Sequence, residues 1–309
     1  MSLSRASFGE RGSYLPSLVN ITQFIGWTAV NTFIAAQSVG LILTQLLGWP
    51  SFGQPGGAKG LVVGIIVMSI LHILSVSAGS RSIQMIERLG IILVLVFVIW
   101  ESVAVFKTVS LTEIAHWQVP AKARMTTGAA IDYVAAFNLA WVTAGADFTR
   151  FTPSRANSVV SPFVGAMVGV LWFAFIGLIS TISIAITSGA YNANNSDPST
   201  IAAKLGLGVI ALLVIVLTSM TANAVNLLGA GSALSNIFPK LNLKLALWIV
   251  VILATVVTLI PMFVGSFFRH LRKLSGLRGD GPRTHDCHHL YRLLLEGKAP
   301  LPGRRIWPG

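Results

Sequence analysis

The segment PSLVNITQFIGWTAVNTFIAAQSVGLILTQL, residues 16–46, decides the fold class of this chain. It carries no charged residue and is long enough to cross about 30 Å of hydrocarbon, for which a helix needs roughly 20 residues. The lipid core offers no water to backbone amides, and the segment lacks the alternation of a barrel strand, so we expect a transmembrane helix. Its Asn, Gln, Thr and Trp side chains are costly in hydrocarbon unless they pair or face a cavity.

The rest of the chain has the same character, because 54% of its 309 residues are hydrophobic and only 10% are charged. A soluble domain carries about 25% charged residues, so we predict an all-α polytopic membrane protein. Further apolar segments of span length lie at 60–78, 84–106, 128–148, 162–189, 206–237 and 243–268. The prediction is therefore seven spans within residues 16–268, a cytoplasmic segment at residues 1–15 and a tail at residues 269–309.

The formal net charge of +12 does not indicate a nucleic-acid partner, because nine of the 22 Lys and Arg residues lie in the tail. The tail also holds His285, Cys287, His288 and His289, whose spacing matches no standard zinc pattern. A basic segment at the membrane surface is one interpretation. The abrupt change in composition at residue 269 favours an out-of-frame translation of the gene's 3′ end, and we prefer that hypothesis.

Polar side chains concentrate in three of the predicted spans. In the first span, Trp27 and Asn31 are four residues apart and share a helix face, an arrangement that suits a flat, hydrogen-bonding ligand. The alternative is that such amides only bond neighbouring helices together. The span at 206–237 is the most polar, and its hydroxyl and amide oxygens suit Na⁺ or a neutral polar substrate. Its polar residues are Thr218, Ser219, Thr221, Asn223, Asn226, Ser232, Ser235 and Asn236.

Ionisable residues also lie within or near the predicted spans, and we consider two roles for them. Asp147 and Arg150 lie near the cytoplasmic end of the span at 128–148, and their three-residue spacing favours a structural or gating ion pair. A proton relay through other ionisable side chains stays open, although most of them lie near span ends, where interfacial solvation explains them. These side chains are His72, Glu87, Glu101 and Asp132. The sequence has no nucleotide-binding glycine loop and no hydrolase motif, so we expect neither an enzyme nor an organic cofactor.

Three stretches of the sequence are similar to one known family. They are RASFGERGSYLPSLVNITQFIGWTAVNTFIAAQ at 5–37, ADFTRF at 146–151 and MTANAVNLLGAGSALSNIFP at 220–239. Together they resemble the nucleobase:cation symporter-1 family, in particular its purine–cytosine permeases. The resemblance implies two inverted repeats of five helices, with substrate at mid-membrane between helices 1, 3, 6 and 8. The seven spans here would be helices 3–9 of that fold.

The resemblance also implies roles for individual residues. Trp27 would stack against a nucleobase, while Asn31 and Asn226 would hydrogen-bond it. The aromatic residue that closes the stack on the sixth helix aligns with Asn138 or its neighbour Phe137, and less well with Trp141. In the eighth helix, Thr221 would supply a hydroxyl to a coupling Na⁺. Met220 stands where sodium-coupled members have a second hydroxyl and Leu217 replaces a small residue, so coupling to H⁺ stays open.

The resemblance leaves helices 1 and 2 and the C-terminal spans without a counterpart, so it predicts a truncated copy. The resulting expectation is a multi-pass permease of the plasma (inner) membrane that carries a small nucleobase, with its oligomeric state open. Related cargoes are hydantoin, allantoin, uracil and a hydroxymethylpyrimidine. Two rivals from other classes are a non-transporting scaffold or channel, and a membrane enzyme that uses the tail's His and Cys residues with Asp147.

Overall fold

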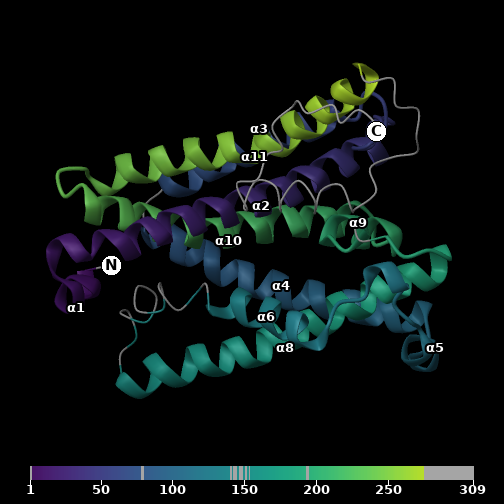
Figure 1. Ribbon diagram of the computed structural model, residues 1–309, viewed down its shortest axis with the longest axis horizontal. Helices are drawn as coiled ribbons and strands as arrows, with labels where there is room; N and C mark the ends of the chain where they lie inside the picture. Colours follow the sequence, from purple (N-terminus) through teal and green to yellow (C-terminus); the bar gives the residue numbers. More distant parts are fainter. Residues whose placement is uncertain are drawn as a thin grey trace, which may run out of the picture. The chain divides into compact units, whose positions relative to one another are not determined.

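The computed structural model describes residues 2–77, 80–139, 141, 145, 149, 152, 154–192 and 195–274. All regular structure in these ranges is helical, which confirms the all-α prediction (Figure 1). The chain divides into two units, Met1–Pro261 and Met262–Gly309. All side-chain contacts described below belong to the first unit. The predicted tail, residues 269–309, lies outside the described residues from residue 275 onward.

Six helices in the described ranges are long and apolar enough to cross a membrane, and they correspond to six of the seven predicted spans. These helices are α2 (Tyr14–Leu47), α3 (Ala58–Ser77), α4 (Ser80–Thr108), α8 (Arg155–Ser188), α10 (Gly208–Ile237) and α11 (Leu243–Leu274). The shorter helices are α1 (Ser2–Gly12), α5 (Leu111–His116), the 3-10 helix η1 (Ala121–Ala123), α6 (Thr127–Leu139) and α9 (Pro198–Lys204).

The predicted span at 128–148 lies only partly within the described residues. Its helix, α6, has 13 residues and ends at Leu139, so at 1.5 Å per residue it covers only about 20 Å. The backbone N–H of Trp141 donates to the carbonyl of Asn138 at 3.2 Å, a tight turn of the kind that closes a helix. Most of residues 140–153 lie outside the described part of the chain, including Asp147 and Arg150.

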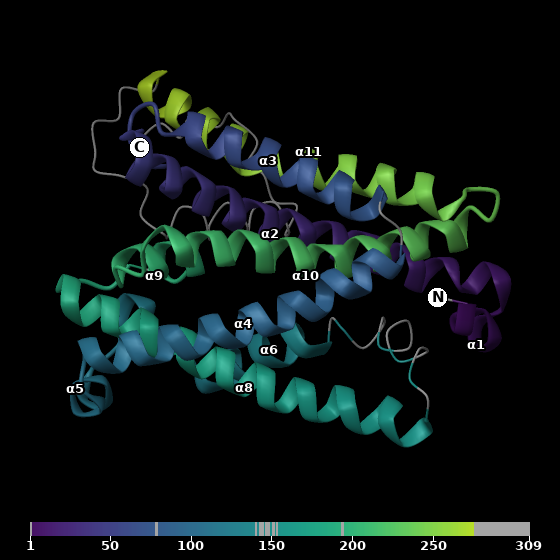
Figure 2. The same ribbon diagram turned by 180° about the vertical axis from the view of Figure 1, so that it is seen from behind.

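Helices α2 and α10 form the centre of the first unit and share its most extensive contact. Figures 1 and 2 show them side by side, with α3 and the start of α11 on one side and α4, α6 and α8 on the other. Phe24 of α2 is fully buried and packs with Leu227 of α10 and Val250 of α11 in one apolar cluster. A second cluster joins α4, α8, α9 and α10 through residues such as Phe97, Ile176 and Leu212.

The predicted cytoplasmic segment, residues 1–15, is tied to the end of α10. Arg5 donates from Nε to Asn236 Oδ1 at 2.7 Å and from Nη2 to the Asn236 carbonyl at 2.8 Å. The Asn236 amide in turn donates to the hydroxyls of Ser13 and Ser17. A cation at a helix C-terminus satisfies open carbonyls and complements the helix dipole. These hydrogen bonds join the junction of α1 and α2 to the end of α10.

Helices α2 and α3 approach closely because small residues face each other. A Cβ atom on Gly64 would lie 2.6 Å from Ala36 Cα, and one on Gly60 would lie 3.3 Å from Gly40 Cα. Both pairs are four residues apart on their helices, the small-xxx-small spacing that lets membrane helices pack through their backbones. The α2–α3 contact therefore depends on residues with little or no side chain.

We expect Gly64→Val to destabilise the protein by about 1–3 kcal/mol, because the added side chain would collide with the α2 backbone. Thermal unfolding of the purified protein in detergent measures the effect. Gly177→Val is the matched control, because a Cβ at Gly177 on α8 meets no atom within 4 Å. Equal melting temperatures for the two variants would contradict this account of the α2–α3 contact.

Candidate functional site

A buried polar cluster joins α2, α3 and α10 around the side chain of Asn223. We define the Asn223 cluster as six residues, namely Thr28, Asn31, Thr32, His72, Asn223 and Asn226. The helical period places the first three on one face of α2 and the two α10 amides three residues apart on one face of α10. Asn223, Asn226, Thr32 and His72 are each at most 2% exposed. Polar groups buried this deeply in a membrane helix bundle need partners.

Asn223 supplies most of these partners. Its Oδ1 accepts from Asn31 Nδ2 at 3.2 Å and from Asn226 Nδ2 at 3.3 Å. Its Nδ2 lies 3.2 Å from Thr32 Oγ1, 3.3 Å from the Thr28 carbonyl and 3.1 Å from His72 Nε2. An amide nitrogen is a donor only, so His72 must accept through an unprotonated Nε2. Asn223 therefore fixes the orientation of both neighbouring amides.

Two polar atoms of the cluster are left over. Thr28 Oγ1 and Asn226 Oδ1 are buried and have no hydrogen-bond partner among the described residues. Buried polar atoms in native structures are nearly always bonded, so atoms of this kind need an explanation such as a ligand or water. Asn31 and Asn226 each donate one N–H to Asn223 Oδ1, which fixes their orientation, and the buried Asn226 oxygen can then accept from a ligand. The cluster is therefore suited to a small ligand that presents N–H donors.

An aromatic side chain accompanies the cluster. Trp27 is half-buried and precedes Asn31 by one helical turn on α2. On the same helix, Phe24 lies against Trp141, with ring centroids 5.6 Å apart and an interplanar angle of 57°. Among the described residues, Trp141 is therefore an aromatic residue after α6 that lies against α2. A planar heterocycle beside these helices can stack and form hydrogen bonds at the same time.

Asn138, another predicted substrate residue, is not part of the Asn223 cluster. Asn138 donates from Nδ2 to the Val134 carbonyl of its own helix at 2.8 Å. It lines a cavity of about 550 Å³ between α6 and α8, together with Tyr133 and Phe173. The side chain of Phe137 lies outside the described part of the chain. Of the predicted substrate residues, the structure brings together Asn31 and Asn226, with Trp27 on the same helix face as Asn31.

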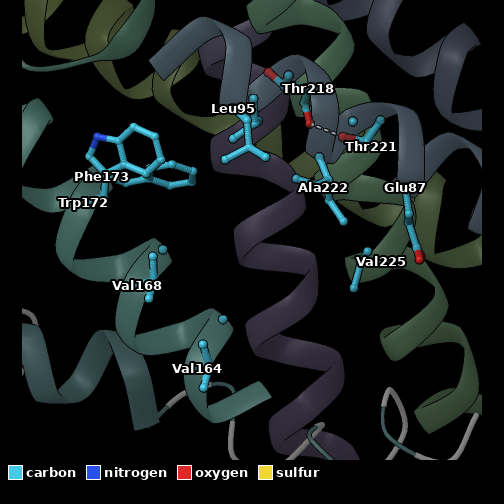
Figure 3. A pocket seen from close by; sticks show the side chains of 15 residues that line it. Glu87, Leu95, Val164, Val168, Trp172, Phe173, Thr218, Thr221, Ala222 and Val225 are labelled. Atoms are coloured by element: carbon cyan, nitrogen blue, oxygen red, sulfur yellow. Dashed lines mark hydrogen bonds between the residues drawn. The ribbon is translucent and has the colours of Figure 1, made fainter. Parts of the chain in front are cut away.

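Thr221, the predicted cation ligand, lies on a different face of α10. Its Oγ1 donates to the Thr218 carbonyl at 2.7 Å, and its side chain packs so closely on Gly90 of α4 that a Cβ there would lie 2.6 Å from Thr221 Cβ. Figure 3 shows Thr218 and Thr221 beside the labelled Glu87 at a groove. This groove, about 690 Å³ and mostly apolar, lies between α4, α8 and α10. Thr221 and the Asn223 cluster therefore occupy separate environments.

Sequence reasoning did not place Asn223 or His72 in the substrate site. Asn223 was visible as one of the polar residues of its span, three residues before Asn226 and so on nearly the same helix face. His72 stood alone in an apolar segment, and no local pattern linked it to Asn223, which follows it by 151 residues. Only the packing of α3 against α10 brings the imidazole to the amide.

The comparisons with known proteins agree with the family resemblance. A family model described as a permease for cytosine/purines, uracil, thiamine and allantoin matches residues 1–275. The allantoin permease of Bacillus subtilis (strain 168) is 26% identical over 282 residues, covering 81% of this chain and 54% of that protein. The purine-uracil permease NCS1 of Arabidopsis thaliana is 24% identical over 254 residues, covering 77% of this chain and 41% of that protein.

This chain spans about half the length of the curated relatives it matches. No solved structure matches it.

Proposed function

This chain belongs to the family of permeases for cytosine/purines, uracil, thiamine and allantoin, and on that premise we propose that it binds a cytosine- or purine-type nucleobase for cation-coupled symport. The proposed location is the plasma membrane, where a multi-pass permease gives the cell access to external nucleobases. The binding site would be the Asn223 cluster together with Trp27. The observation that carries this proposal is Asn226 Oδ1, which is buried beside Asn223 and has no hydrogen-bond partner in the described part of the chain.

The chemistry of the cluster supports a flat heterocycle with N–H groups. Nucleobases combine a stacking face with an edge of donors and acceptors, and stacking on an aromatic side chain contributes about 1–3 kcal/mol per base. Trp27 would supply the face, and the oxygens of Asn31 and Asn226 would accept from the edge. Binding of a cation to one of two conformations would favour that conformation and so couple the two gradients. H⁺ and Na⁺ both remain candidates, with Thr221 as a proposed Na⁺ ligand on the groove side of α10.

A second cargo has specific support. One relative is named an allantoin permease, and allantoin presents several N–H donors, which the amide oxygens of the cluster could accept. Hydantoin, uracil and hydroxymethylpyrimidine share part of this pattern. Because a stacking residue accepts any flat ring, the choice among them depends on the donor pattern at Asn31 and Asn226.

Equilibrium binding to the purified full chain in lipid nanodiscs tests the proposal. We expect labelled cytosine to bind saturably, and unlabelled adenine, uracil, allantoin and hydantoin to compete with different affinities. Free ribose, which lacks an aromatic face, serves as the control competitor. Uptake into vesicles is measured separately, because binding needs fewer structural elements than transport. A chain that binds none of these ligands at any pH from 5 to 8 would contradict the proposed function.

A further inference from the structure

A carboxyl group is buried between two membrane helices away from the Asn223 cluster. Glu101 of α4 is 7% exposed, and its Oε1 accepts from the hydroxyl of Ser180 on α8 at 2.6 Å. Ser180 itself is fully buried. Phe97 and Val98 lie within a turn of Glu101, Ile176 lies a turn before Ser180, and all three belong to one apolar cluster. An ionisable group inside the membrane usually has a functional role.

No cation compensates this carboxyl group within the described residues, where the Ser180 hydroxyl is its only hydrogen-bond partner. Helix α10, which packs on α4, contains no titratable residue, and α8 contains only Arg155 at its start. The other titratable groups on α4 and on the helices packed against α4 and α8 form no hydrogen bond or ion pair with Glu101. They are Lys59, His72, Glu87, Arg88, Lys107, Glu113, His116 and Lys204; the side chain of Arg81 lies outside the described part.

The Glu101–Ser180 contact lies where α4 and α8 meet. All buried residues of α8 lie from Ile176 onward, whereas residues 159–168 are exposed. The groove between α4, α8 and α10 is lined on α8 by residues from Val164 to Phe173 and on α4 by residues up to Leu95. The carboxyl group therefore lies about two helical turns beyond Leu95, where the groove closes. Figure 3 shows Leu95, Trp172 and Phe173 at this end of the groove.

We propose that Glu101 is a proton-binding site whose protonation holds α4 and α8 together, so that the proton is the coupling ion of this permease. The protonated acid is neutral and keeps its bond to Ser180 inside the apolar cluster. On release, the carboxyl O–H bond breaks, the proton passes to water, and the negative charge stays on the carboxylate. An unpaired carboxylate in apolar surroundings is strongly unfavourable. Water must reach it, which requires α4 and α8 to separate at the closed end of the groove.

Only the role of the proton as coupling ion rests on the proposed function. The proton-dependent contact between α4 and α8 does not depend on whether the protein carries a nucleobase. A second buried hydroxyl, Ser183 Oγ, has no hydrogen-bond partner within the described ranges and lies one turn after Ser180. This hydroxyl is a polar atom beside the Glu101–Ser180 contact, where it can form a hydrogen bond with water or with the proton that leaves Glu101. Because α4 also packs on α10 at Gly90 and Thr221, a movement of α4 would reach the helix that carries Asn223 and Asn226.

The test measures the distance between α4 and α8 without any ligand. In the full chain with Cys287→Ser, spin labels are placed at Leu89→Cys on α4 and Val160→Cys on α8, which are both exposed and lie within about one helical turn of groove-lining residues. We expect the distance distribution to shift to longer values as pH rises from 5 to 8. Glu101→Gln keeps the shape and neutrality of the acid, so its distribution should stay at the low-pH distance throughout. Glu101→Met, also neutral, serves as a second variant if Glu101→Gln does not reconstitute.

Glu113→Gln is the control variant. Glu113 is exposed on α5, where the hydroxyl and the backbone N–H of Ser110 both hold the pKa of its carboxyl below the usual value. It stays ionised from pH 5 to 8 and should leave the response of the spin labels unchanged. A distance that does not change with pH, or one that changes equally in Glu101→Gln, would overturn the proposal. Absent nucleobase binding would instead count against the proposed function, because the distance measurement uses no ligand.

Discussion

Replacing Asn223 with Leu should weaken nucleobase binding by roughly 10- to 100-fold, which corresponds to about 1.4–2.8 kcal/mol. Leucine has a similar size but offers no acceptor to Asn31 and Asn226 and no donor to Thr32 or His72. The two flanking amides would lose their fixed orientation, and each buried group left without a partner costs about 1–3 kcal/mol. The variant should therefore lose stability as well as affinity, although Asn223 itself donates nothing to the proposed ligand.

Two measurements separate these effects. Thermal unfolding in detergent shows whether Asn223→Leu still folds, and equilibrium binding of labelled cytosine in nanodiscs gives the affinity of the folded fraction. Asn157→Leu, at an exposed position near the start of α8, makes the same chemical change outside the cluster and should alter neither quantity. A folded Asn223→Leu protein with unchanged affinity would show that the cluster only joins helices.

Trp27→Ala should also reduce affinity by roughly 10- to 100-fold, because stacking of a base on an aromatic side chain contributes about 1–3 kcal/mol. Trp27→Phe keeps a ring and should recover most of the loss. Trp27→Ala should cost less stability than Asn223→Leu, since Trp27 is half-buried and Asn223 is fully buried. Competition binding with cytosine, uracil and allantoin measures the change for each ligand, and a similar loss for all of them is expected.

Trp117→Ala is the control for the tryptophan variant. Trp117 follows α5 and lies against Tyr191, with ring centroids 5.9 Å apart, outside the membrane-spanning helices. Its removal should leave nucleobase affinity unchanged. If Trp27→Ala changes only assembly or stability and leaves ligand selectivity intact, the scaffold interpretation of the polar residues gains support over the permease site.

Much of the fold could be predicted because a membrane span is a local property. Length and composition alone identified the segments that became α2, α3, α4, α8, α10 and α11. The structure describes the first part of the span predicted at 128–148 as α6, and most of residues 140–148 lie outside the described part. Hydropathy depends on the composition of the side chains and not on the hydrogen bonds of the backbone. It therefore could not predict the turn in which the Trp141 N–H bonds to the Asn138 carbonyl.

The candidate site was predictable only in part. Asn31 and Asn226 carried the family pattern, and the structure places them on either side of Asn223. The same pattern grouped Thr221 with Asn226, yet the two positions lie five residues apart, about 140° around the helix. Asn226 consequently lies beside Asn223, which contacts α2, whereas Thr221 faces Gly90 on α4. A motif that is continuous in sequence thus contributes to two separate environments.

The sequence by itself determined that this protein crosses the membrane as helices, which of those helices carry polar faces, and which family it resembles. These properties depend on the composition and helical period of each segment. Only the tertiary structure decided that His72 meets Asn223 and that Glu101 meets Ser180. Those contacts join helices distant in sequence, and small residues such as Gly64 set how closely α2 and α3 approach. A polar residue in a span must find a partner, but its identity depends on how the helices pack.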